Sequence, residues 1–374
     1  MRIKSIEVFA IRLPLISPFI VSYHTYHDMP SIIVKIETEC GLEGYGEATP
    51  DEHVTGETWE STYAVLTKTL APALLGTNPF QIEKLHDQMN KLVLGVPSAK
   101  AAIDIACYDV MGKATGQPVY NLLGGKYHDT LEIPKVISIL TPTEMALEAK
   151  QAIEEGYKTL KLKVGTDYKL DVERIKAVRN EVGEDIALKV DANQGWITSS
   201  NSLYVLDRIR DTQIDWIEQP VKADDLDALR EVKQKTSIPV MVDEGIHGTK
   251  DLKEVMVKRA ADKINIKLMK CGGLYPASQL VHQAEMGGLD CQVGSMVESA
   301  IASAAGLHLS IAKKNIHSNE LVGPLMFQKD IASLNYDIPF VHLSTEPGLG
   351  IRVDKAILKE LTSYSLEIKE SASV

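Results

Sequence analysis

The sequence predicts an α/β protein built around a parallel (β/α) barrel, with a smaller α+β region made from both ends of the chain. From residue 126 to 324, short apolar runs alternate with amphipathic segments at a period of about 26 residues, which suits one strand, one helix and two loops. Eight such runs fit a closed barrel better than an open doubly wound sheet. No Gly-rich dinucleotide-binding or phosphate-binding loop follows any of these runs.

The two ends of the chain predict the smaller region. Residues 3–12 and 31–38 alternate as strands, and the segment 17–30 between them, rich in aromatic residues, histidine and proline, predicts an ordered loop. Helical periodicity follows over 57–75, 79–94 and 98–115. The segment 325–374 returns to irregular and β-like patterns, so we expect it to fold back onto the N-terminal part. The expected regions are therefore an α+β capping domain (1–125), a barrel (126–324) and a C-terminal segment that completes the cap (325–374).

The composition is that of an acidic globular protein that acts on a small molecule. The 374 residues are 44% apolar and carry a formal net charge of −11, which argues against nucleic acid as a partner. No apolar run reaches about 18 residues and the N-terminus reads as a strand, so we expect neither export nor a membrane span. The four cysteines lie far apart, which favours reduced thiols over disulfides or a zinc site. These features predict a cytoplasmic protein.

Each of five reactive residues ends an apolar run of the barrel region. They are Lys163, Asp191, Glu218, Asp243 and Lys267, about 24 to 28 residues apart. Because the carboxyl ends of barrel strands meet at one rim, we expect these side chains to share a site. A single strand-end acid is often a helix cap, but three uncompensated carboxylates would be costly and predict a shared cation. Oxygen ligands without nearby histidine or cysteine favour Mg²⁺, with Mn²⁺ as a second candidate.

The lysines predict acid–base chemistry. Lys161 and Lys163 are two residues apart on one strand, so both face the barrel interior, where two close ammonium groups lower each other's proton affinity. Lys163 belongs to the second strand and Lys267 to the sixth, so we expect them to face each other across the mouth. A substrate held between them would expose its two faces to two bases. This suits removal of the α-proton of a carboxylate and its return from the other face, with Lys161 stabilising the enediolate charge, that is, racemisation or epimerisation.

These residues match a known family: the chain resembles the enolase superfamily, muconate-lactonising subgroup, over nearly its whole length. The matching segments are Lys161-Leu162-Lys163, Val190-Asp191-Ala192-Asn193, Ile217-Glu218-Gln219-Pro220, Val242-Asp243-Glu244, Asn265-Ile266-Lys267 and the helical residues 101–106. The resemblance implies a modified TIM barrel, (β/α)7β, under a cap from both termini. It also implies Mg²⁺ on the three acids, Lys163 and Lys267 as the acid–base pair, and a homo-oligomer.

Within this subgroup, residues 267–273 and 294–299 are most similar to N-succinylamino-acid (N-acylamino-acid) racemases. Dipeptide epimerases carry Asp-x-Asp at the eighth strand, whereas this chain has Ser318-Asn319-Glu320, which weakens that alternative. o-Succinylbenzoate synthesis and muconate-type cycloisomerisation use the same bases and stay open as alternatives. By the resemblance, Ser295 and Glu298 border the substrate and Asn193 supports the metal shell. The alternative for Glu298 is a cap of the seventh barrel helix.

Two N-terminal segments, 19–30 and 49–58, are expected to close over the mouth and set specificity. Asp51 and Glu52 in the second segment suit the cationic side chain of an N-succinyl arginine or lysine, and a solvated acidic loop is the alternative. The first segment offers further candidates for the same pocket, which packing explains equally well: Tyr23, His24, Tyr26 and His27.

Overall fold

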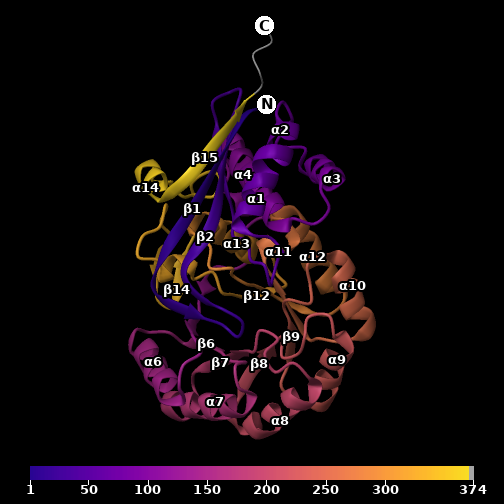
Figure 1. The fold of residues 1–374 in the computed structure, drawn as a ribbon, viewed down its shortest axis with the longest axis vertical. Coiled ribbons are helices and arrows are strands. Elements are labelled where there is room, and N and C mark those ends of the chain that lie inside the picture. Colours follow the sequence, from indigo (N-terminus) through magenta and orange to yellow (C-terminus); the bar gives the residue numbers. More distant parts are fainter. Residues whose placement is uncertain (370–374) are drawn as a thin grey trace.

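The chain folds into a barrel and a cap (Figure 1). The computed structural model describes residues 1–369, and the last five residues of the predicted C-terminal segment, 370–374, lie outside that range. In the barrel, eight strands are joined in the order β12-β11-β10-β9-β8-β7-β6-β5, each parallel to its neighbour. The strands are β5 (Lys135–Ile137), β6 (Thr159–Lys163), β7 (Ala187–Asp191), β8 (Ile214–Glu218), β9 (Val240–Val242), β10 (Lys263–Ile266), β11 (Asp290–Val293) and β12 (Ile316–Asn319). Neighbours in the sheet are neighbours in the sequence, which confirms the predicted barrel topology.

The first predicted barrel strand, over 131–138, is wrong in detail. Pro134 has no N–H to give to a ladder, and the run is divided into β4 (Leu131–Glu132) and β5. β4 pairs antiparallel with β14 (Phe340–His342), which itself pairs with β13 (Asn335–Asp337). Asn319, at the end of the last barrel strand β12, donates from its side-chain amide to the backbone oxygen of Glu132 in β4 at 2.9 Å.

Helices connect the barrel strands, most of them on the outside of the barrel (Figure 1). They are α6 (Pro142–Glu154), α7 (Tyr168–Val182), α8 (Ser199–Ile209), α9 (Leu226–Lys235), α10 (Thr249–Lys258), α11 (Leu268–Cys271), α12 (Leu274–Met286) and α13 (Ala300–Ala312). Several begin at a side chain that accepts a backbone N–H, such as Thr141, Asp167 and Thr198. All residues of α13 are buried, since this helix lies between the barrel and the cap.

The cap contains strands from both ends of the chain. Its sheet has the order β15-β1-β2-β3, with β1 (Ile3–Ile20), β2 (Thr25–Thr38), β3 (Glu43–Ala48) and β15 (Thr362–Lys369), all antiparallel. Its helices are α1 (Trp59–Val65), α2 (Ala71–Leu74), α3 (Ile82–Leu92), α4 (Pro97–Thr115), α5 (Val119–Leu122) and α14 (Lys355–Leu361), with a π-helical turn at Leu66–Leu70. The predicted return of the C-terminal segment to the N-terminal part is thus present as the pairing of β15 with β1.

The predicted loop over 17–30 is instead mostly strand. β1 continues to Ile20 and β2 begins at Thr25, so the two form one long hairpin with a register shift between Pro14 and Phe19. The prolines in this segment do not end the strands, because proline is tolerated at bulges and strand edges. Within residues 1–369, no helix is both long and apolar enough to cross a lipid bilayer.

Candidate active site

The carboxyl ends of five neighbouring strands bring the predicted residues together. Lys163, Asp191 and Glu218 are the last residues of β6, β7 and β8, and Asp243 and Lys267 directly follow β9 and β10. The first three pair in register, so Lys163 lies beside Asp191 and Asp191 lies beside Glu218. All five residues are buried. The side chains that the sequence placed on one rim therefore form one site.

Lys161 lies deeper in the barrel, two residues before Lys163. Its ammonium nitrogen is 2.9 Å from Asp191 Oδ2, 2.9 Å from Glu218 Oε2 and 2.6 Å from Glu320 Oε2. Burial lowers the pKa of Lys161, but the three carboxylates outweigh burial and raise this pKa well above its ordinary value. The expectation that a neighbouring lysine would lower the proton affinity is wrong for Lys161. This residue is a fixed cation beneath the site.

Lys163 lies between an acid and an amide. Its ammonium group donates to Asp191 Oδ2 at 2.6 Å and to Asn193 Oδ1 at 3.1 Å. Asn193 also donates from Nδ2 to Glu244 Oε1 at 3.0 Å, and from its backbone N–H to Asp191 Oδ1 at 2.9 Å. Its φ of 39° lies in the left-handed region, which asparagine tolerates better than most residues. Asn193 thereby orients Lys163 and links it to the end of β9.

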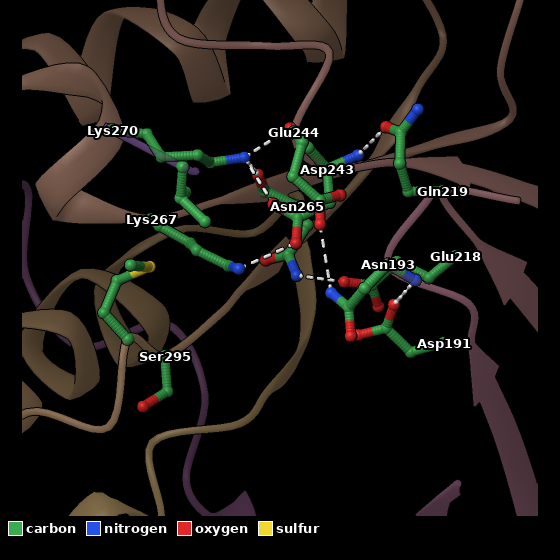
Figure 2. Close-up of polar contacts among 12 residues, drawn as sticks. Asp191, Asn193, Glu218, Gln219, Asp243, Glu244, Asn265, Lys267, Lys270 and Ser295 are labelled. Carbon is green, nitrogen blue, oxygen red and sulfur yellow. Dashed lines mark hydrogen bonds and ion pairs between the residues drawn. The ribbon is translucent and has the colours of Figure 1, made fainter. Parts of the chain in front are cut away.

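On the opposite side of the rim, two lysines hold Asp243 (Figure 2). Lys267 Nζ lies 2.7 Å from Asp243 Oδ2, and Lys270 donates to Oδ1 and to the backbone oxygen of the same residue. Burial raises the pKa of Asp243, but the two lysines outweigh burial and lower this pKa. Burial lowers the pKa of Lys267, but Asp243 and Glu244 outweigh it and raise this pKa. Asp243 and Lys267 therefore form an ion pair.

The acids of the rim are candidate ligands for a divalent cation. Asp191, Glu218 and Asp243 have no solvent-exposed area. In the described part of the chain, Oδ2 of Asp243 and Oε2 of Glu244 are buried without a hydrogen-bond partner. The contact of Lys267 with Asp243 Oδ2 is close in distance but does not meet hydrogen-bond geometry. Burial and the neighbouring Asp191 raise the pKa of Glu218 well above its ordinary value. A cation among these carboxylates would relieve this crowding, and a donor set of oxygens alone suits Mg²⁺ or Mn²⁺.

A cavity of about 630 Å³, counted with the space open to solvent, lies above the rim. Both Lys163 and Lys267 line it, although their strands are four positions apart in the sheet. Lys161, Asn193 and Glu320 line it as well. Its outer walls come from the β1–β2 hairpin and from late loops, through Phe19, Val21, Tyr23, Tyr26, Met29, Ser295, Met296, Val297, Val322 and Met326.

The acidic segment after β3 also reaches the cavity. Asp51 is buried in the cavity wall, accepts the N–H groups of His53 and Val54 at 2.8 and 3.0 Å, and accepts the hydroxyl of Tyr26. Glu52 is exposed and does not line the cavity. Tyr23 and Tyr26 line it as well, whereas the two histidines of the hairpin are exposed. The two neighbouring acids thus differ: Asp51 is buried in the cavity wall, whereas Glu52 is exposed to solvent.

The loop after β11 forms another part of the wall. Ser295 lines the cavity, and its hydroxyl donates to Glu298 Oε2 at 2.8 Å. Glu298 Oε2 also accepts the N–H of Met296 at 2.6 Å, so this buried carboxylate supports the loop from behind and is not among the residues that line the cavity. Burial raises the pKa of Glu298 to about 7. The cap of α13 is Ser299 rather than Glu298.

Three charged residues of the site are not among those that the sequence pattern predicts. Glu320 directly follows β12, so the strand-end rule that found the other acids also applies to it. Glu244 follows Asp243, and Lys270 lies three residues after Lys267, one turn along the short helix α11. Their contacts depend on how the loops fold back over the rim, and spacing along a strand does not predict this.

Comparison with known proteins agrees with this geometry. Residues 4–124 match the family model described as the mandelate racemase / muconate lactonizing enzyme N-terminal domain, and residues 144–357 match the model described as enolase C-terminal domain-like. The N-succinyl-L-Arg/Lys racemase of Bacillus cereus is 56% identical over 97% of this chain and 99% of that protein. The crystal structure of the N-succinyl Arg/Lys racemase from this organism has a TM-score of 0.98 at 55% identity, covering 99% of this chain and 100% of that chain.

A second relative is the hydrophobic dipeptide epimerase of Enterococcus faecalis, 40% identical over 94% of this chain and 99% of that protein. A dipeptide epimerase from the same organism, in complex with Mg and the dipeptide L-Leu-L-Tyr, has a TM-score of 0.91 at 39% identity, covering 94% of this chain and 99% of that chain.

The barrel, its cap and the rim of acids between lysines define an enzyme of the enolase superfamily. More narrowly, the chain belongs to the mandelate racemase / muconate lactonizing enzyme family. Its close relatives are racemases and epimerases, so it is an isomerase.

Proposed function

We propose that this protein is an N-succinylamino-acid racemase that prefers arginine or lysine side chains. The observation that carries the proposal is that Lys163 and Lys267, from strands four positions apart, line one cavity with three buried acids between their strands. A carbon atom held between two such amines can lose a proton to one and receive a proton from the other. The racemase of Bacillus cereus, similar over nearly the whole chain, supports this class of substrate.

The proposed roles follow from the contacts. Lys163 and Lys267 exchange the α-proton at their Nζ atoms, one as base and the other as acid. Asn193 orients Lys163, and Lys161 contributes fixed positive charge where negative charge develops on the substrate carboxylate. Asp191, Glu218 and Asp243 would hold Mg²⁺, which when bound supplies further positive charge near that carboxylate. The similar dipeptide epimerase in complex with Mg supports this metal.

Asp51 is the proposed partner of the substrate's cationic side chain. It lies in the cavity wall with Tyr23 and Tyr26, on a cap segment rather than on the barrel strands that carry the acid–base pair. Burial strengthens an ion pair because fewer waters screen it. A guanidinium or ammonium group reaching this wall would therefore gain more from Asp51 than from the exposed Glu52.

The test is an activity screen with N-succinyl-L-arginine, N-succinyl-L-lysine and a neutral N-succinyl amino acid, with and without Mg²⁺. Loss of optical rotation measures racemisation, and ¹H NMR in D₂O measures exchange of the α-proton. We expect racemisation of the basic substrates, with deuterium entering both enantiomers. Failure to racemise any N-succinyl amino acid, together with turnover of dipeptides or of a cycloisomerase substrate, would contradict the proposal.

A further inference from the structure

The N-terminus of α13 is held by carboxylates from both halves of the cap. The first N–H groups of a helix have no partner within the helix. Here Ser299 N and Ala302 N donate to Glu47, at 2.9 and 3.1 Å. Ala300 N donates to Asp330 Oδ2 at 3.0 Å, and the N–H of the following residue, Ile301, donates to Ser299 Oγ at 3.2 Å. All four N–H groups are therefore satisfied, three of them by residues of the chain's terminal segments.

Glu47 has the largest share of these contacts. It lies in β3 with no exposed area, and it accepts four hydrogen bonds in total. Besides the two helix N–H groups, Ser299 Oγ donates to it at 2.6 Å and Ser31 Oγ, on the neighbouring strand β2, donates at 2.7 Å. Its two oxygens thus join the cap sheet to a barrel helix that lies about 250 residues away in the sequence.

β3 itself has a fixed position in the cap. A Cβ atom at Gly46 would lie 1.9 Å from the backbone oxygen of Ala102 in α4. The strand and the helix are therefore so close that only glycine fits at this position. Glu47 is the next residue along the strand. Its carboxylate is therefore held by the cap and is not free to follow the barrel helix.

The helix that Glu47 holds follows directly after the loop that lines the cavity. Ser295, Met296 and Val297 form this wall, and Val297 has a left-handed φ of 60°. The loop keeps its shape through Glu298, whose carboxylate accepts from Ser295 and Met296 and whose backbone precedes the helix cap Ser299. A shift of the α13 N-terminus would move Glu298, and with it the wall.

We propose that Glu47 is a positioning residue: through the N-terminus of α13, the cap uses it to set the Ser295–Val297 wall against the substrate. Glu47 does not line the cavity and touches no reacting atom. The inference rests on the proposed function for the identity of the substrate, but the position of the wall can be measured without substrate.

Glu57 provides a matched control. Its buried carboxylate also accepts two N–H groups at a helix N-terminus, Ser98 N at 2.8 Å and Ala99 N at 3.1 Å. That helix is α4, so the whole interaction lies within the cap. Glu57 itself does not line the cavity, so its substitution removes the same kind of contact without touching α13 or the Ser295–Val297 wall.

The experiment compares Glu47→Gln with Glu57→Gln by amide hydrogen exchange and by kinetics. In Glu47→Gln we expect amide hydrogen exchange at residues 295–302 to become faster. We expect KM to rise roughly tenfold, which corresponds to the loss of one charge-assisted hydrogen bond, and kcat to change less than about threefold. Glu57→Gln should raise exchange near residues 98 and 99 and leave exchange at residues 295–302 at the parent value. If Glu47→Gln does not fold, Ser299→Ala removes the 2.6 Å contact from the other side and is expected to behave alike.

Two outcomes would overturn the inference: unchanged exchange at residues 295–297 in Glu47→Gln, or an equal rise of exchange at these residues in both variants. Exchange that rises at 295–302 while KM stays at the parent value would also overturn it, since Glu47 would then be only structural. A parent enzyme that racemises no N-succinyl amino acid would instead contradict the proposed function. The exchange at residues 295–297 would still decide the role of Glu47.

Discussion

Lys163 places its ammonium nitrogen 2.6 Å from Oδ2 of Asp191. The proposed base and a proposed cation ligand are thus direct neighbours, so a substitution at either position changes the surroundings of the other. Tests of the acid–base pair therefore need variants that keep the charge beside Asp191.

Lys163→Arg keeps a cation next to Asp191 but removes the base, because a guanidinium stays protonated. We expect racemisation to fall by roughly 10²- to 10⁴-fold, since that is the usual contribution of a general base. The enantiomer that gives its proton to Lys267 should still exchange its α-proton, as measured by ¹H NMR in D₂O.

Lys267→Arg is the corresponding control on the opposite side of the site. It should retain exchange of the α-proton from the other enantiomer. Full activity of Lys163→Arg would show that this lysine acts only as a cation. That result would favour the cycloisomerase or o-succinylbenzoate synthase alternative over racemisation.

Asp51→Asn should raise KM for N-succinyl arginine and lysine by roughly 10- to 100-fold, the cost of losing one charge-assisted contact in a buried site. KM for a neutral N-succinyl amino acid should stay within about twofold. Initial rates on the three substrates measure the difference, and Glu52→Gln, next to Asp51 but exposed, is the control. An equal rise of KM for neutral substrates would remove the proposed ion pair.

Substitutions of two proposed metal ligands should lower the free energy of unfolding of the metal-free protein by different amounts. Asp243→Asn leaves Lys267 and Lys270 without the carboxylate that both contact, so we expect a loss of about 3–5 kcal/mol in the free energy of unfolding. Glu218→Gln neutralises an acid whose pKa burial and Asp191 already raise, and should cost less than about 2 kcal/mol. Urea unfolding in the presence of a chelator measures both values, and equal losses would contradict this view of the rim.

Mg²⁺ should stabilise the parent protein by mass action, by about 2.7 kcal/mol at 100 times its dissociation constant. The same addition should leave the unfolding of Asp243→Asn nearly unchanged, because a ligand of the cation is missing. Ca²⁺-free and Mg²⁺-free buffers provide the baseline. Equal stabilisation of parent and variant would place the cation elsewhere.

The contact of Asp330 with α13 predicts a pH dependence of stability. Burial and the nearby Glu47 raise the pKa of Asp330 from 3.8 to about 7. Between about pH 4 and pH 7 the folded state therefore binds more protons at this position than the unfolded state, and stability falls as the pH rises, by up to about 4 kcal/mol. Asp330→Asn should remove this part of the slope.

Unfolding free energies of parent and Asp330→Asn at several pH values between 4 and 8 measure the effect. The comparison must be between the two proteins, because the buried His308, whose pKa is lowered to about 4, contributes in the opposite sense over the lower part of this range. Parallel pH profiles would show that Asp330 does not titrate differently in the folded state.

The sequence predicts the site residues that lie at strand ends, but it predicts less well the contacts whose geometry depends on loops. Asp191, Glu218 and Lys163 were found because strand ends of a barrel meet at one rim. The contacts of Lys270 with Asp243 depend on the turn of α11, and the division of the first strand depends on one proline. Only the tip of the β1–β2 hairpin, residues 17–30, is predicted as a loop, because its aromatic and proline residues resemble those of loops, although cross-strand pairing holds most of them extended.

The strand that completes the cap sheet follows every barrel strand in the sequence. β1 is finished within the first twenty residues, whereas its partner β15 ends at Lys369. During translation the free edge of β1 therefore stays open while every barrel strand leaves the ribosome, and such an edge can pair with other chains. A nascent chain halted before residue 362 would carry every barrel strand but an open sheet edge in the cap, so protection of this edge from other chains waits for β15.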